Sequence, residues 1–218
     1  MKDTQNKQLK YEKALEYEIF IKQEYGFAKG KIENAKCIFD VGWHIWLFTK
    51  RCKKLNNLAE IHYFEPIGEL YNQAKSDLWD NKIHFNNYWI AQKSGQEIIL
   101  LNPEKTMQSS KYKSFLNPNW VETVVNFITL KAYLEQESIN KIDVLKMDIE
   151  WMEFEVFNSW WDFERSRIEN LISEIHLLND EMKSERDQIL PKIKNIFWSV
   201  KTIDSWYRDE IFLLRARK

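Results

Sequence analysis

The sequence AKCIFDVG at residues 35–42 is a short apolar run that ends on an acid and a glycine. Such a run is typical of a buried strand in a parallel sheet, and it leads into a loop. Comparable runs follow in IHYFEP at 61–66, IDVLKMD at 142–148 and LISEIH at 171–176. Helical patterns lie between or after them, at 45–57, 68–80, 129–137, 151–160 and 180–196. Strands that alternate with helices predict an α/β fold with a mostly parallel sheet covered on both faces.

The two ends of the chain extend this pattern. Residues 3–25 are charged with helical spacing, and we predict an N-terminal helical extension over 1–34, before a domain that spans 35–218. Near the other end, residues 194–203 and 210–216 indicate a terminal antiparallel pair of strands. The predicted fold is therefore a doubly wound, mostly parallel sheet with a terminal antiparallel pair.

The middle of the chain contains further strand signals. Residues 83–91 and 96–101 are strand-like and flank Lys93-Ser94-Gly95, which predicts a hairpin. Residues 121–128 predict another strand. Between these runs, 102–119 is the longest loop-like stretch, and loops of this length are often functional.

Composition limits the class of protein. The 218 residues include 32 Lys and Arg against 33 Asp and Glu, a net charge of −1, so we expect no nucleic-acid partner. The two cysteines, Cys37 and Cys52, make no disulfide framework and are expected to be reduced thiols. No apolar run approaches 18 residues, so we expect a cytoplasmic protein with no membrane partner. The sequence indicates no oligomeric state.

Polar residues at the ends of the predicted strands are the candidates for function, because parallel sheets bind ligands at the carboxyl ends of their strands. They are Asp40, Glu65, Asp148 with Glu150, and Glu174 with His176. A glycine after a strand, here Gly42, lets a ligand approach the backbone closely. An acid in the position of Glu65 can accept both ribose hydroxyls of a nucleoside, but a carboxylate on a solvated rim explains it equally well.

Four motifs in order carry a more specific signal. They are IFDVG at 38–42, YFEP at 63–66, VLKMDIE at 144–150 with Glu153, and ISEIH at 172–176. Together they resemble the FkbM family of S-adenosylmethionine-dependent O-methyltransferases, over about residues 35 to 178. The resemblance implies a Rossmann-like class I methyltransferase sheet, S-adenosylmethionine as the cofactor, and an acceptor hydroxyl on a sugar, a glycan or a small natural product.

The resemblance also implies roles for individual residues. The turn from Asp40 to Gly42 would hold the methionine part of the cofactor, Glu65 would bind the ribose, and Asn87 would lie beside the adenine. Asp148 would contact the methionine part or the acceptor hydroxyl.

Methyl transfer to a hydroxyl requires that its proton be removed. We expect Asp148, Glu150 and His176 to be catalytic: a neutral His176, or a carboxylate among Asp148, Glu150 and Glu174, would take the proton. A structural His176 that bonds to a loop carbonyl is an equal alternative.

The sequence predicts no metal site, because its histidines and acids lack the spacing of zinc ligands. Carboxylates at 148–153 would suit Mg²⁺, but Glu153 and Glu155 are expected to be salt-bridged surface acids.

The departures from the family pattern concentrate near the expected cofactor. The family has Asp-Val-Gly-Ala-Asn-Ile-Gly and a glycine after Asp-Ile-Glu, where this chain has Trp43, His44, Trp46 and Trp151. One alternative is therefore a catalytically inactive binding module whose cofactor pocket is filled by tryptophans. Another is that UGA codons read as glycine by the source organism have been translated as tryptophan. The chain has 5 glycines and 10 tryptophans, whereas ordinary usage of about 7% would give roughly 15 glycines.

Overall fold

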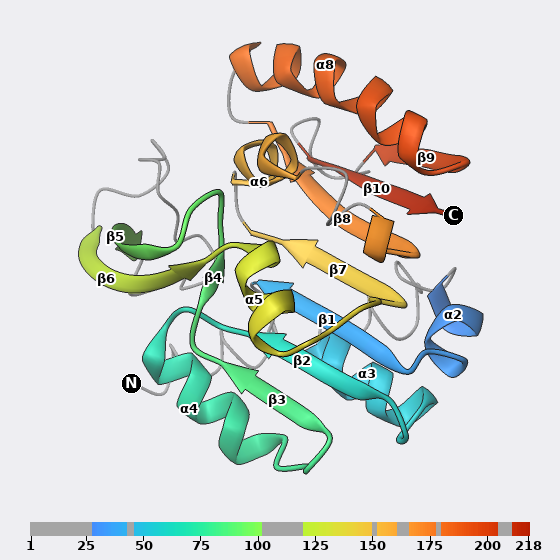
Figure 1. Ribbon diagram of the computed structural model, residues 1–218. Helices are drawn as coiled ribbons and strands as arrows, with labels where there is room; N and C mark the ends of the chain where they lie inside the picture. Colours follow the sequence, from blue (N-terminus) through green and yellow to red (C-terminus); the bar gives the residue numbers. More distant parts are fainter. Residues whose placement is uncertain are drawn as a thin grey trace, which may run out of the picture.

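The computed structural model describes seven segments of the chain (Figure 1): 28–42, 46–101, 120–149, 152–160, 166–177, 180–204 and 211–218. The predicted helix at 3–25 and the loop at 102–119 lie outside them. The division at residue 34 stays a prediction. Within the described part, Ala28 and Ile32 are buried beside the first strand of the sheet.

The central sheet has seven strands in the order β3-β2-β1-β7-β8-β10-β9 (Figure 1). The first five run parallel to one another, β10 is antiparallel to β8, and β9 is antiparallel to β10. The bounds are β1 Cys37–Gly42, β2 Glu60–Phe64, β3 Ile83–Asn86, β7 Val144–Asp148, β8 Asn170–His176, β9 Ser199–Asp204 and β10 Ile211–Arg217. The predicted α/β fold with a terminal antiparallel pair is confirmed.

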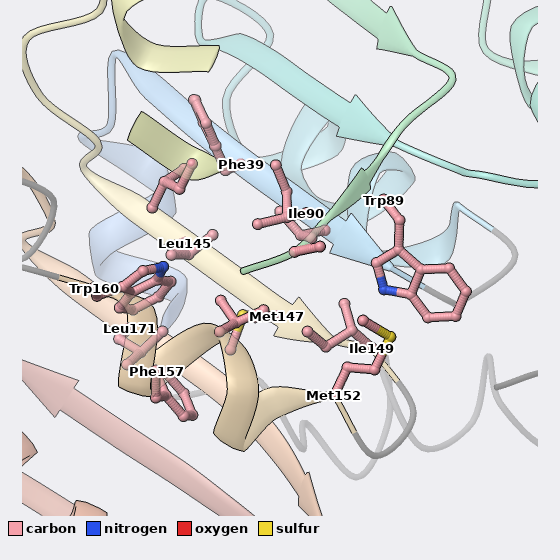
Figure 2. Close-up of a cluster of buried hydrophobic side chains, with 14 of the residues drawn as sticks. Phe39, Trp89, Ile90, Leu145, Met147, Ile149, Met152, Phe157, Trp160 and Leu171 are labelled. Atoms are coloured by element: carbon pink, nitrogen blue, oxygen red, sulfur yellow. The ribbon is translucent and has the colours of Figure 1, made fainter. Parts of the chain in front are cut away.

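Alternating side chains of these strands face two apolar clusters, because successive residues of a strand point to opposite faces. On one face, Phe39 and Leu145 pack with α5 Leu130–Gln136, α6 Glu153–Ser159 and α8 Asp180–Ile196 (Figure 2). On the other face the cluster includes residues of α2 Lys29–Glu33, α3 Leu47–Leu55 and α4 Gly68–Asp77. The sheet is therefore covered on both faces, which explains why its central strands are almost continuously apolar.

A second sheet has three strands in the order β4-β6-β5, with bounds Trp89–Ile90, Val121–Ile128 and Gly95–Leu101. The predicted hairpin is wrong: β4 and β5 lie on opposite sides of β6, so they do not pair with each other. The turn at Lys93-Ser94-Gly95 carries the chain from one side of β6 to the other. The residues of the turn alone cannot indicate that β6 lies between the two strands that the turn connects.

Two further findings concern the cysteines and the helices. Cys37 and Cys52 are both free thiols, one half-buried and one buried. Among the described helices, none combines the length and the apolar character that crossing a bilayer requires.

Candidate functional site

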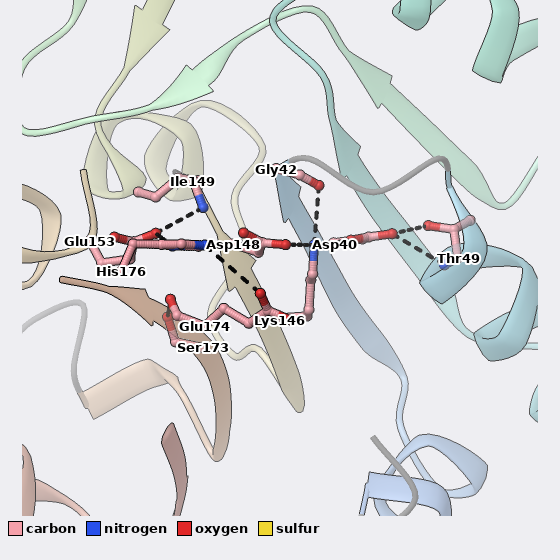
Figure 3. A network of polar contacts seen from close by, with 10 residues as sticks. All are labelled: Asp40, Gly42, Thr49, Lys146, Asp148, Ile149, Glu153, Ser173, Glu174 and His176. Atoms are coloured by element: carbon pink, nitrogen blue, oxygen red, sulfur yellow. Dashed lines mark hydrogen bonds and ion pairs between the residues drawn. The ribbon is translucent and has the colours of Figure 1, made fainter. Parts of the chain in front are cut away.

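The parallel register brings the predicted site residues to one edge of the sheet. Gly42 at the end of β1 lies opposite Asp148 at the end of β7, and Met147 lies opposite Ser173 in β8. Asp40, Asp148, Glu174 and His176 therefore gather where three neighbouring strands end (Figure 3). Glu150, the third predicted catalytic residue, lies outside the described residues.

Asp40 is fully buried, and its described partners are Thr49 and Lys146. Its Oδ2 accepts hydrogen bonds from the Thr49 backbone N–H at 3.1 Å and from the Thr49 hydroxyl at 2.7 Å. Burial raises the pKa of Asp40, although Lys146 and Thr49 oppose this rise. Asp40 thus joins β1 to the first turn of α3 through Thr49.

Lys146 is a site residue that the sequence analysis missed. Its Nζ lies 3.6 Å from Asp40 Oδ1 and 3.8 Å from Asp148 Oδ2, and it donates a hydrogen bond to the Gly42 carbonyl at 3.2 Å. The side chain is only 1% exposed. A lysine inside an otherwise apolar strand was the available signal, because lysines are almost never fully buried without partners.

Gly42 has φ +83°, a conformation that favours glycine. A Cβ at this position would lie 1.8 Å from the Asp148 carbonyl oxygen. A close approach was predicted for Gly42, and the atoms that come close to its missing Cβ belong to the neighbouring strand β7. This approach lets β1 and β7 remain paired up to the point where the site begins.

Glu65 follows directly after β2 and is only 3% exposed, so the solvated-rim alternative is wrong. Its Oε1 accepts a hydrogen bond from the Ile67 backbone N–H at 2.8 Å. Burial raises its pKa to about 8, against opposing contributions from Ile67 and Lys146. Asn87 donates hydrogen bonds to the carbonyls of Glu65 at 2.8 Å and Pro66 at 3.0 Å, so these two predicted cofactor residues are neighbours.

His176 pairs with a buried acid. Its Nδ1 lies 3.0 Å from Glu153 Oε1, which also accepts a hydrogen bond from the Ile149 N–H at 3.2 Å. Glu153 is 0% exposed, so its predicted place on the surface is wrong. The partner found for Nδ1 is a carboxylate, where the structural alternative expected a loop carbonyl. His176 Nε2 lies 3.9 Å from Glu174 Oε2.

Trp46 occupies the family's glycine position and has φ +34° and ψ +19°, in the left-handed region. Its side chain is buried at the start of α3, 4% exposed. A bulky residue held there costs roughly 1–3 kcal/mol of strain. Trp43 and Trp151 lie outside the described residues. Trp89 packs in the core against Phe127, so this tryptophan has a structural role.

The order and the parallel pairing of the strands define the class of fold, a Rossmann-like α/β fold with a terminal antiparallel pair. Two solved structures share this fold: a putative rRNA methylase from Clostridium thermocellum (TM-score 0.53, 8% identity, 90% of this chain and 94% of the other) and an rRNA methylase from Streptococcus thermophilus (TM-score 0.50, 11% identity, 91% and 98%). No curated protein matches the sequence.

The model of the methyltransferase FkbM domain matches residues 40–197, most of the chain, and the protein belongs to this family. It is an S-adenosylmethionine-dependent methyltransferase. The described residues fit this cofactor: the buried Glu65 carboxyl, whose pKa is raised by burial, would gain from the two hydroxyl donors of a ribose.

Proposed function

We propose that the enzyme methylates a hydroxyl group of a small molecule, a sugar or a glycan in the cytoplasm. The observation that carries this proposal is the cluster of Asp148, Glu174 and His176, whose ligand atoms lie within 4.8 Å of one another. A hydroxyl is a poor nucleophile until its proton is removed, and these groups can serve that step. The net charge of −1 supports an acceptor other than nucleic acid.

The cofactor would lie along the carboxyl ends of β1 and β2. Glu65 accepts hydrogen bonds from the ribose hydroxyls, and Asn87, held by the carbonyls of Glu65 and Pro66, flanks the adenine. Asp40 acts indirectly, because it fixes Thr49 and so the start of α3, beside the expected place of the methionine part. When bound, S-adenosylmethionine would supply an electrophilic methyl group carried on a sulfonium, with a neutral thioether as the leaving group.

The residues at the ends of β7 and β8 act on the acceptor. Their task is to align its oxygen and to help remove its proton as the new oxygen–carbon bond forms. Glu153 fixes the orientation of the His176 ring through the 3.0 Å contact to Nδ1, so Nε2 is directed at the cluster. The proton then passes to Nε2 directly or, where Nε2 instead helps to bind a cation that makes the hydroxyl more acidic, to water.

A binding module without catalysis is the second candidate, and the buried Trp46 with its left-handed backbone favours it. In this alternative the indole fills the space that the family's glycine leaves for the cofactor. The protein would then retain the fold and lose the reaction.

Calorimetry with S-adenosylmethionine separates the two candidates, followed by an assay for S-adenosylhomocysteine with a panel of sugars and other hydroxyl compounds. We expect binding, and product with at least one hydroxyl acceptor. Binding that yields product only with amine acceptors would refute O-methylation. An absence of binding in a folded preparation would favour the occluded pocket.

A further inference from the structure

We propose that Asp148, Glu174 and His176 form a site for a divalent cation, which binds the acceptor hydroxyl. The proposal deepens the proposed O-methylation and rests on it for the role of the ion. It replaces the sequence-based prediction of no metal. It also differs from the Mg²⁺ alternative at 148–153, because two of the three ligands come from β8 (Figure 3).

The backbone places the three ligands on one side of the strand ends. Glu174 and His176 are two residues apart in β8, so their side chains share a face of the strand. Asp148 ends the neighbouring strand β7, one residue beyond the Met147–Ser173 pair. The ligand atoms all lie within 4.8 Å of one another. With metal–oxygen bonds of roughly 2.0–2.6 Å, ligands of one Mg²⁺ or Ca²⁺ ion lie about 3–4 Å apart when adjacent and about 4–5 Å apart when opposite, so separations of up to 4.8 Å are within reach of one ion.

The orientation of His176 is the one that metal-binding histidines usually have. In the tautomer that donates from Nδ1 to Glu153, Nε2 is the nitrogen that accepts, and it points toward Glu174 at 3.9 Å. A ligating histidine almost always donates its other N–H to a carboxylate, a carbonyl or a water, which fixes the ring. Glu153 supplies such a carboxylate, and the Ile149 N–H holds it in place.

The second, independent observation concerns the charge of Asp148. This residue is 3% exposed, and its Oδ1 has no hydrogen-bond partner, while Oδ2 lies 3.8 Å from Lys146. Its carboxylate lies between Lys146 and His176 (Figure 3). Burying a carboxylate oxygen without a partner is costly. Lys146 is also shared with the buried Asp40, so a cation beside Glu174 and His176 would compensate a charge that the lysine only partly balances.

Three protein ligands leave coordination positions open. Carboxylates suit Mg²⁺, Ca²⁺ and Mn²⁺, and imidazole suits Zn²⁺ and other transition metals, so this mixed set favours an ion such as Mn²⁺. An acceptor hydroxyl bound at an open position loses its proton more easily, because the cation stabilises the alkoxide. The proton passes to water, the alkoxide oxygen takes the methyl carbon, and the electron pair of the broken carbon–sulfur bond remains on sulfur.

Titration of the full chain with Mn²⁺ alone, followed by electron paramagnetic resonance, tests the site without any methyl transfer. We expect one site, with an affinity that falls at least tenfold in Glu174→Gln and in His176→Gln. Glu169→Gln, which removes an acid at the amino end of the same strand, should leave the affinity unchanged. Glu153→Gln should weaken binding by about 10–100-fold, since it alters only the support of His176.

Thermal unfolding of each variant without metal shows whether it folds. Glu174→Gln is nearly isosteric, so it is the variant expected to disturb folding least. Absence of Mn²⁺ binding to the wild type, or equal binding in folded Glu174→Gln, would overturn the site. Methyl transfer that persists in EDTA would refute the role of the ion and leave the proposed function intact. Mn²⁺ binding without hydroxyl methylation would refute the function and leave the site.

Discussion

Strands β2 and β7 of the central sheet each have an acid at both ends, and the two ends differ in how those acids are paired. At the amino ends, Glu60 of β2 pairs with Lys82 and His84. Asp143, just before β7, accepts hydrogen bonds from the backbone N–H groups of Lys36 and Cys37. At the carboxyl ends of the same two strands, Glu65 and Asp148 are buried.

The pKa values follow this difference. Hydrogen bonds from Lys82 and His84 lower the pKa of Glu60, and burial of Asp143 is outweighed by its backbone hydrogen bonds, which lower its pKa. Burial raises the pKa of Glu65 to about 8. Acids at the amino ends are thus satisfied by the protein and stabilise it. At the carboxyl end of β2, the buried Glu65 carboxylate is costly in the isolated chain, as expected where a ligand or substrate completes the site.

The largest expected effect is on turnover, and it should distinguish Asp148 from Asp143, which lie at opposite ends of β7. Asp148→Asn and His176→Ala should each lower turnover by about 10²–10⁴-fold, the usual cost of removing a group that handles the proton. Asp143→Asn should leave turnover unchanged. Steady-state kinetics on an active preparation measure this, with calorimetry to show that the His176 variant still binds S-adenosylmethionine. Normal turnover in His176→Ala would move the proton transfer elsewhere.

The second effect concerns the two ends of β2. Glu65→Gln should weaken S-adenosylmethionine binding at least tenfold, because two charge-assisted hydrogen bonds of roughly 1.5–3 kcal/mol each lose their charge. The melting temperature without ligand should hardly move, since the glutamine can still accept from the Ile67 N–H. Glu60→Gln is the matched control and should bind the cofactor normally. Unchanged affinity of Glu65→Gln for S-adenosylmethionine would show that Glu65 does not bind the ribose.

The pH dependence of binding sharpens this test. The ionised Glu65 is the better acceptor for ribose hydroxyls, and its pKa in the free protein is about 8. Binding should therefore favour the carboxylate, and affinity should rise as the pH rises toward 8 and level off above it. Calorimetry across this range should give a flatter profile for Glu65→Gln.

The sequence predicted the strand ends well, and for a physical reason. A strand buried on both faces must be continuously apolar, so Asp40, Glu65, Asp148 and His176 are visible as the polar residues that interrupt or end such runs. Parallel topology then places them at one edge. The sequence contains less information on contacts that depend on distant partners. The hairpin at Lys93-Ser94-Gly95 failed because β6, more than 20 residues later, lies between the two strands.

Two residues of the site were missed for the same reason. Glu153 was expected on the surface, because an acid in the first turn of a helix is usually exposed. Only the approach of β8 brings His176 to it. Lys146 is recognisable as a charge within an apolar strand, but its position between Asp40 and Asp148 follows from the pairing of β1 with β7.

The third effect concerns the tryptophans near the carboxyl ends of the strands, which could fill the cofactor pocket. The triple change Trp43→Gly, Trp46→Gly and Trp151→Gly should tighten S-adenosylmethionine binding, measured by calorimetry. Trp46 supports this expectation, because a glycine relieves its left-handed backbone at an entropic cost of about 0.5–1 kcal/mol. In the gene, we expect UGA at these positions and UGG at core tryptophans such as Trp89. Weaker binding after the change, together with UGG throughout, would identify the indoles as functional.

The smallest effect belongs to the amino end and concerns stability alone. Asp143→Asn should lower the free energy of unfolding by about 1 kcal/mol at neutral pH, because the hydrogen bonds from the Lys36 and Cys37 N–H groups lose their charged acceptor. The folded-state pKa of Asp143 lies below its ordinary value, so its contribution is complete above that value and is lost as the pH falls through the folded-state pKa. Denaturant unfolding measured at a series of pH values should therefore give free energies of unfolding for wild type and variant that differ by a constant amount above about pH 4 and converge below it. A difference that instead grew as the pH fell would mean that Asp143 is protonated more readily in the folded protein, and the contrast between the two ends of β7 would disappear.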